Sequence, residues 1–161
     1  MHRVQQFLGH LTARVSADDA ALAHRVLPEG AGELFAQMPV ADRRHGLDVA
    51  TRLLATGWDD PDLLAAALLH DAAKGRRMRL WHRVGGVLLE AFAPGLLRRL
   101  ARDDPASWRY PWHLYLHHAE LSARAALDAG CGERTAAFIR GRVDPADAAA
   151  AAALHAADEA A

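Results

Sequence analysis

The chain has 161 residues, 52% of them hydrophobic and 24% charged, with a formal net charge of −1. This length and composition predict one globular domain with a core of its own and exclude a disordered chain. The near-neutral charge argues against bulk attraction to nucleic acid, so we expect no specific nucleic-acid binding. The single cysteine, Cys131, excludes an internal disulfide framework and suits a reducing compartment.

The first residues, "MHRVQQFLGHLTARV", carry charges throughout and lack the uncharged apolar stretch of a signal peptide. No stretch approaches the roughly 18 uncharged apolar residues that a membrane span needs. Together with the single cysteine, these observations predict a soluble cytoplasmic protein without a transmembrane segment.

Helices are the only regular structure that the sequence predicts, because alanine and leucine dominate and apolar residues recur at helical spacing. Ser16 is an expected N-cap, and Gly57 and Gly130 are expected to close helices. Pro28 and Gly30 are expected to end one. The expected helices cover residues 2–15, 18–27, 32–38, 40–56, a segment from about Pro61 into residues 68–75, 78–101 with a kink at Pro94, 111–129, 133–142, and an alanine-rich segment from Pro145 to the end.

Residues 68–75, "LLHDAAKG", end an apolar helix with three polar side chains. His70 and Lys74 are one helical turn apart, and Asp71 lies between them, so all three can share one side of the helix end. Burying such groups without partners costs several kcal/mol, about 2–7 for a polar group and more for a charge. They are therefore either solvated or satisfied by something specific.

Two further candidates stand in predicted helices on either side of this motif in the sequence, His45 in "DRRHGLDVA" and Asp158 in "LHAADEAA". Imidazole and carboxylate are ligands of zinc, manganese and iron, and helical bundles can assemble such ligands from several helices. A lone histidine among apolar residues more often bonds a carbonyl in the core. We expect that role for His24, His82 and His155.

The order His45, His70-Asp71, Asp158 resembles the HD superfamily of metal-dependent phosphohydrolases, which is named for the His-Asp pair. The string "LLHDAAKG" is similar to the "LLHDIGK" form of the motif in HDIG-type members. "HHAELSARAALDAGC" resembles the downstream "HHPELGAELARAAG" helix of many bacterial members, and "LHAADEA" resembles their closing helix. The resemblance covers roughly residues 39–161.

This resemblance implies an all-α, compact helical bundle of the HD-domain type over residues 39–161, with residues 1–38 as a helical extension packed on it. It also implies that His45, His70, Asp71 and Asp158 bind one divalent cation, whose identity among Mn, Fe, Zn, Mg, Ni and Co is left open. Lys74 would contact a substrate phosphate, and Asp71 would orient or deprotonate the attacking water.

One departure from the family pattern concerns a second ion. His118, and with it His117, resembles the histidines that hold a second metal in two-metal relatives. Their closing His-His pair is replaced here by "IRGRV". Because an arginine opposes a second cation and binds phosphate, we expect one ion per chain with Arg142 as a substrate-binding candidate. The Gly-Tyr-Pro motif of cyclic-di-GMP phosphodiesterases is absent.

Two functions remain open from the sequence. The first is a phosphomonoesterase or phosphodiesterase acting on a phosphorylated small molecule or a nucleotide. The second is a regulatory or scaffolding module in signalling that keeps the fold without turnover. The sequence does not indicate an oligomeric state.

Overall fold

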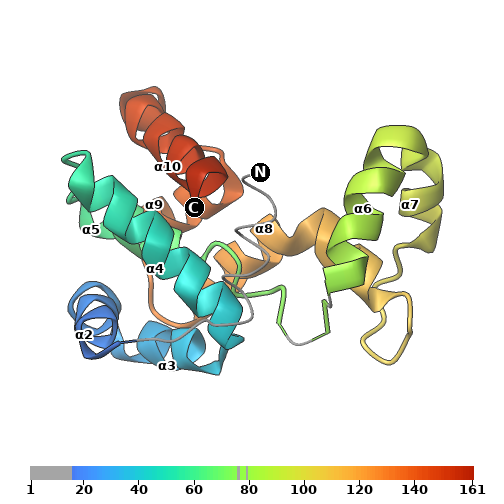
Figure 1. The fold of residues 1–161 in the computed structure, drawn as a ribbon, viewed down its shortest axis with the longest axis horizontal. Coiled ribbons are helices and arrows are strands. Elements are labelled where there is room, and N and C mark those ends of the chain that lie inside the picture. Colours follow the sequence, from blue (N-terminus) through green and yellow to red (C-terminus); the bar gives the residue numbers. More distant parts are fainter. Residues whose placement is uncertain (1–15, 76, 79) are drawn as a thin grey trace.

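The computed structural model describes residues 16–75, 77–78 and 80–161, and every regular element within them is a helix. The all-α prediction is thereby confirmed for this part of the chain, while the helix predicted over 2–15 lies outside it. The elements are α2 (Ala17–Val26), α3 (Glu29–Gln37), α4 (Val40–Ala55), α5 (Pro61–Leu69), α6 (Leu80–Phe92), α7 (Pro94–Leu100), α8 (Tyr110–Asp128), α9 (Glu133–Arg140), a 3-10 turn η1 (Pro145–Asp147) and α10 (Ala148–Ala160) (Figure 1).

Helix α5 lies at the centre of the bundle. Its start is set by the Asp60 side chain, which accepts a hydrogen bond from the Leu63 amide at 3.0 Å, and by Pro61 in the first turn. Residues 63–69 are all buried, because α2, α4, α8, α9 and α10 pack around this helix. A helix that is apolar on every side needs such surroundings to be stable in water.

The N-terminal helices α2 and α3 belong to the same core. Ser16 caps α2 as predicted, and its side chain and the Asp19 side chain each bond the other residue's amide. Pro28, however, starts α3 rather than only ending α2, and Gly30 lies inside α3. A Cβ on Gly30 would stand 2.8 Å from the Ala129 carbonyl oxygen, so glycine permits a close helix contact there.

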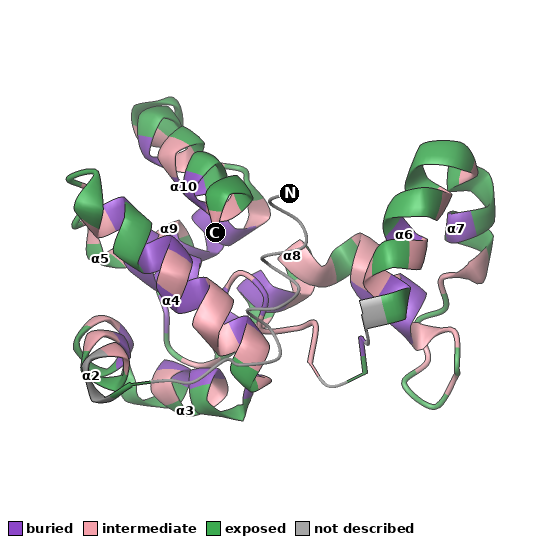
Figure 2. Ribbon diagram, in the orientation of Figure 1, coloured by how far each residue is buried: buried purple, intermediate pink, exposed green. Residues whose placement is uncertain are grey.

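The kinked helix predicted over 78–101 is two helices instead. Ala93 adopts φ −149° and ψ 58°, which breaks the helix, and Pro94 begins α7. Helices α6 and α7 pack on each other and on α8, and they project to the right of the other helices in Figure 1. Most of their surface is exposed (Figure 2), so this hairpin departs from a single compact bundle.

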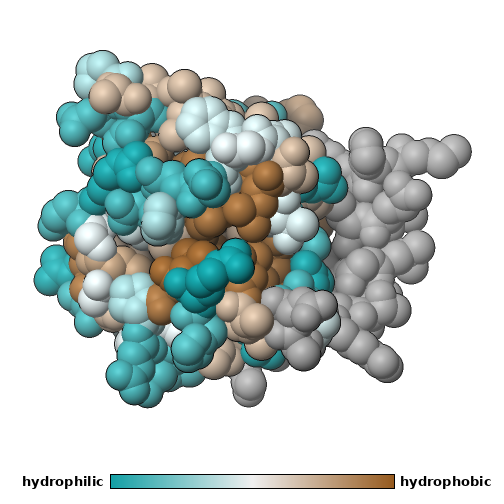
Figure 3. Space-filling view, turned by 90° about the vertical axis from the view of Figure 1, so that its left-hand side faces the viewer, coloured by the Kyte–Doolittle hydropathy of each residue, from teal (hydrophilic) through white to brown (hydrophobic). Residues whose placement is uncertain are grey.

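The side of the molecule that lies on the left in Figure 1, opposite α6 and α7, is mostly hydrophilic, with hydrophobic residues exposed near its centre (Figure 3).

Gly57 and Gly130, with φ of +87° and +94°, follow the ends of α4 and α8 as predicted. Helix α9 ends at Arg140, slightly earlier than expected, because Gly141 adopts φ +68°. Among the described residues, no helix combines the length and apolarity needed to cross a bilayer.

Candidate metal centre

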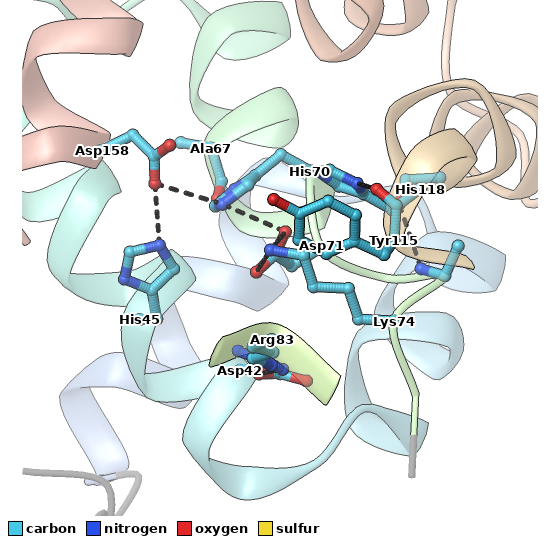
Figure 4. A network of polar contacts seen from close by, with 12 residues as sticks. Asp42, His45, Ala67, His70, Asp71, Lys74, Arg83, Tyr115, His118 and Asp158 are labelled. Atoms are coloured by element: carbon cyan, nitrogen blue, oxygen red, sulfur yellow. Dashed lines mark hydrogen bonds and ion pairs between the residues drawn. The ribbon is translucent and has the colours of Figure 1, made fainter. Parts of the chain in front are cut away.

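The predicted site residues follow the buried end of α5. The helix ends at Leu69, and the amide of His70 makes the last helical bond, to the Ala66 carbonyl at 2.9 Å. Residues 70–75 form turns instead of continuing the helix, and Gly75 adopts φ +53°. The polar side chains therefore project from the end of the core helix into the space between α4, α8 and α10 (Figure 4).

The His70 ring is held in one tautomer. Its Nδ1 lies 2.9 Å from the Ala67 carbonyl oxygen, which can only accept, so Nδ1 carries a proton. The other nitrogen, Nε2, is buried without a hydrogen-bond partner. It lies 3.4 Å from Asp158 Oδ1 and 3.6 Å from Asp71 Oδ1. Metal-binding histidines share this arrangement, with one nitrogen donating to a carbonyl and the other facing the ion.

His45 reaches the site because α4 and α5 approach closely beside it. A Cβ on the neighbouring Gly46 would lie 2.9 Å from the Leu68 carbonyl oxygen and 3.1 Å from that of Ala67. With only hydrogen at this position, the helices come together and the rings of His45 and His70 lie 5.2 Å apart between centroids. The contact at Gly46 therefore sets the position of His45.

Asp158 comes from the last helix. Helix α10 packs on α4 and α5, which brings Asp158 Oδ1 to 2.8 Å from His45 Nε2 (Figure 4). One ligand atom each from His45, His70 and Asp158 lies within 4.8 Å of the others. This group joins α4, the end of α5 and α10, and α10 is far from the other two in the sequence.

These separations fit a divalent ion. Two ligand atoms at about 2.0–2.2 Å from one ion are about 2.8–3.6 Å apart at octahedral or tetrahedral angles. The two histidine nitrogens lie 2.8 and 3.4 Å from Asp158 Oδ1. The buried, unbonded Nε2 of His70 supplies a second indication, because a buried polar atom is normally satisfied.

Asp71, which is buried, and Lys74, which is partly exposed, form an ion pair next to this group. The Lys74 ammonium lies 2.6 Å from Asp71 Oδ1 and 2.7 Å from Oδ2, and it donates a hydrogen bond to Oδ2. Asp71 is outside the group of three, but its Oδ1 faces His70. The structure thus places all four predicted ligands and Lys74 in one cluster.

The carboxylates of the cluster are strongly acidic. Burial by itself would raise the pKa of Asp71, but His70 and Lys74 outweigh it and lower this pKa to about 2. Burial also opposes the shift at Asp158, where the hydrogen bond from His45 and the nearby His70 hold the pKa far below its usual range. Despite burial, the carboxylates of Asp71 and Asp158 raise the pKa of His70.

The remaining predicted residues lie at different distances from the cluster. His118 is near Asp71 and Lys74, and its Nδ1 bonds the Tyr115 carbonyl at 2.9 Å. Burial, and then the charge of Lys74, lowers the pKa of His118. His117 is exposed, with its ring 4.5 Å from that of His113 between centroids. Arg142 is exposed beyond the end of α9.

Sequence reasoning missed two supports of the site. Ser122 on α8 accepts a hydrogen bond from the Ala73 amide at 3.0 Å and so fixes the turn that carries Asp71. Asp42, one turn before His45, is 2% exposed and pairs with Arg83 of α6 at 2.6 Å. The three-residue spacing of Asp42 and His45 places both on one side of α4, and this could have identified Asp42 from the sequence. Nothing in the residues around Ser122 indicates its contact with the Ala73 amide.

Comparisons of the chain with models of protein families, with curated proteins and with solved structures found no match. Membership in the HD superfamily therefore stays a prediction from motif resemblance.

Proposed function

We propose that the protein is a metal-dependent phosphohydrolase of the HD-domain type, acting on a phosphate ester or a nucleotide. The observation that carries the proposal is the Nε2 atom of His70. It is buried, has no hydrogen-bond partner and faces two carboxylates, while Nδ1 is bonded to a carbonyl. A divalent ion is the partner that fits this surrounding, and the order of the ligands along the chain resembles that family.

Three residues would hold the ion, namely His45, His70 and Asp158, with Asp71 beside them. A divalent ion would supply Lewis-acid polarisation of a phosphoryl oxygen and would make water acidic enough to act as a nucleophile near neutral pH. The low pKa of Asp71, about 2, keeps this carboxylate ionised, so it can accept a hydrogen bond and orient that water.

Lys74 supplies positive charge for the substrate. Its ammonium is held by Asp71 and its side chain is 19% exposed, so it can still reach a phosphate oxygen at the surface of the cluster. A fixed cation at this place would stabilise negative charge as it develops on the transferred phosphoryl group. This charge favours a phosphorylated substrate over a neutral one.

Metal binding tests the proposal first. The stripped protein should bind close to one Mn²⁺ or Zn²⁺ per chain, measured by elemental analysis after desalting. His45→Ala should lower the affinity at least about tenfold, because it removes one of the three converging ligands. His155→Ala is the matched control, since His155 lies on α10 but is exposed and faces Glu159.

Activity is tested on the reconstituted protein with a panel of phosphomonoesters, phosphodiesters and nucleotides. Lys74→Ala should reduce turnover while the metal content stays near one. A stripped protein that binds no ion, or binds it equally well after His45→Ala, would refute the metal site. Metal binding without turnover of any phosphate ester would instead support the regulatory or scaffolding function.

A further inference from the structure

The outward side of helix α6 is an uninterrupted apolar surface. Trp81, Val84, Val87, Leu88 and Phe92 are each at least half exposed, and Phe92 reaches 84%. At 100° per residue, these five side chains fall within an arc of about 140° that is centred opposite Gly86. We call them the α6 stripe.

The contacts of α6 with α8 set the rotation of α6 about its own axis. A Cβ on Gly86 would lie 2.5 Å from the Tyr115 ring, and one on Gly85 would lie 2.9 Å from the Trp112 ring. Gly86 lies opposite the centre of the stripe, so its close approach to α8 marks the inner side of α6, whereas Gly85 lies at the edge of the stripe next to Phe92. The α6 stripe therefore cannot rotate inward without breaking this contact.

Both charged residues of α6 also point away from the stripe. Arg83 pairs with Asp42 at 2.6 Å, and Glu90 accepts a hydrogen bond from the Tyr115 hydroxyl at 2.8 Å. On the helical wheel both lie on the flank near Gly86. A second α6 laid on the stripe would therefore face apolar side chains of α6 and neither of its two charged residues.

The size of the stripe suits one copy of the same chain. Aromatic side chains present about 150–250 Å² and aliphatic ones about 100 Å², so the exposed fractions give about 450 Å² of apolar surface. Homodimer interfaces are roughly 60–65% apolar, which corresponds to about 700 Å² per partner. Stable interfaces bury about 800 Å² per partner.

We propose that α6 forms the interface of a homodimer, in which the stripes of two copies pack antiparallel. The stripe has an aromatic residue at each end and aliphatic residues between them. An antiparallel pair centred between Gly86 and Val87 places Trp81 against Phe92 of the partner subunit. In this direction the dipoles of the two α6 helices are antiparallel, which is favourable. The remaining helices of the two copies then lie at opposite ends of the pair, since α6 projects from the rest of its own chain (Figure 1).

The first test is the mass of the full chain in solution, measured by analytical ultracentrifugation over a dilution series. We expect a dimer at micromolar concentration. Leu88→Lys should raise the dissociation constant about a hundredfold, because each dimer buries two unpaired charges. Ala152→Lys, an exposed position on α10, should leave it unchanged. Circular dichroism checks that both variants fold.

A monomer at all concentrations would overturn the proposal. It would point to another occupant, either residues 1–15 or an anionic membrane. Flotation with phosphatidylserine vesicles, and the mass after removal of residues 1–15, separate these two. A dimer that Leu88→Lys does not weaken would also overturn it.

Cysteine cross-linking tests the direction of the pair. Val87→Cys should form an intermolecular disulfide under mild oxidation, because the two copies meet near this residue. Trp81→Cys alone should not, but a mixture of Trp81→Cys and Phe92→Cys chains should. The natural Cys131 is buried and gives little background. Cross-linking of Trp81→Cys with itself would refute the antiparallel arrangement.

Discussion

Replacing Gly46 with alanine should destabilise the protein and weaken metal binding, although alanine is the better helix former. The new methyl group would lie 2.9 Å from the Leu68 carbonyl oxygen, 3.1 Å from that of Ala67 and 3.2 Å from the Leu68 Cα. These atoms belong to the backbone of α5 and cannot rotate away. The better helix propensity of alanine should raise the free energy of unfolding by about 0.5–1 kcal/mol, whereas overpacking should lower it by about 1–3 kcal/mol. We therefore expect a net loss of stability of about 1 kcal/mol.

Gly46→Ala should also weaken metal binding, because His45 is the neighbouring residue on α4. Relief of the clash moves α4 away from α5 and increases the distances from His45 Nε2 to the atoms it faces, of which Asp158 Oδ1 is now at 2.8 Å. Disturbing the residues that orient metal ligands typically costs about 10–100-fold in affinity. We expect a loss near the lower end of that range.

The assay is urea unfolding of the stripped protein, combined with calorimetric titration of Zn²⁺ or Mn²⁺. Gly32→Ala is the matched control, since Gly32 lies within α3 and a Cβ there meets nothing within 4 Å. This variant should gain about 0.5 kcal/mol and bind metal normally. The reasoning fails if Gly46→Ala is as stable as Gly32→Ala and binds metal like the wild type.

Three further predictions concern ion pairs and pH. Arg83→Met should cost about 2 kcal/mol in urea unfolding because it leaves the carboxylate of Asp42 buried and unpaired, and adding Asp42→Asn should recover most of it. In metal-free protein, the pKa of Asp71 is about 2 against its usual 3.8, so the unfolded chain binds more protons between these values. The ionised Asp71 therefore contributes about 2 kcal/mol to the free energy of unfolding above about pH 5, and this contribution is lost as the pH falls toward 2. Between pH 5 and pH 3, the free energy of unfolding should fall less for Asp71→Asn than for the wild type, as measured by urea unfolding. Arg134→Ala should lower the melting temperature by a few degrees, about 1 kcal/mol, because Arg134 joins carboxylates before α5 and in η1, whereas Arg124→Ala on exposed α8 surface should not.

Local signals in the sequence were sufficient for most helix boundaries. Ser16 caps α2, Pro61 lies in the first turn of α5, and Gly57 and Gly130 follow the ends of α4 and α8, all as expected. These features depend on backbone angles and on hydrogen bonds within a few residues, which neighbouring side chains control. The same local information predicted a kink at Pro94, which was wrong: the helix breaks there, since the choice between kink and break depends on whether α7 finds a surface to pack on.

Local signals could not predict that His45 and Asp158 lie close together in the folded chain. His45 and Asp158 are 113 residues apart, and nothing in their local sequence measures the 2.8 Å between their ligand atoms. Their pairing was expected only because the order of motifs resembles a known family. The proximity itself depends on Gly46, which lets α4 approach α5, and on the packing of α10 against both helices.

The helical class, the caps and the residue types available for a metal site can be inferred from the sequence alone, because they follow from local hydrogen bonding and helical periodicity. The folded structure was needed to show that His70 Nε2 has no hydrogen-bond partner, that Asp42 pairs with Arg83, and that the α6 stripe faces outward. Each of these depends on contacts between helices, which arise when buried area and close packing bring distant segments together.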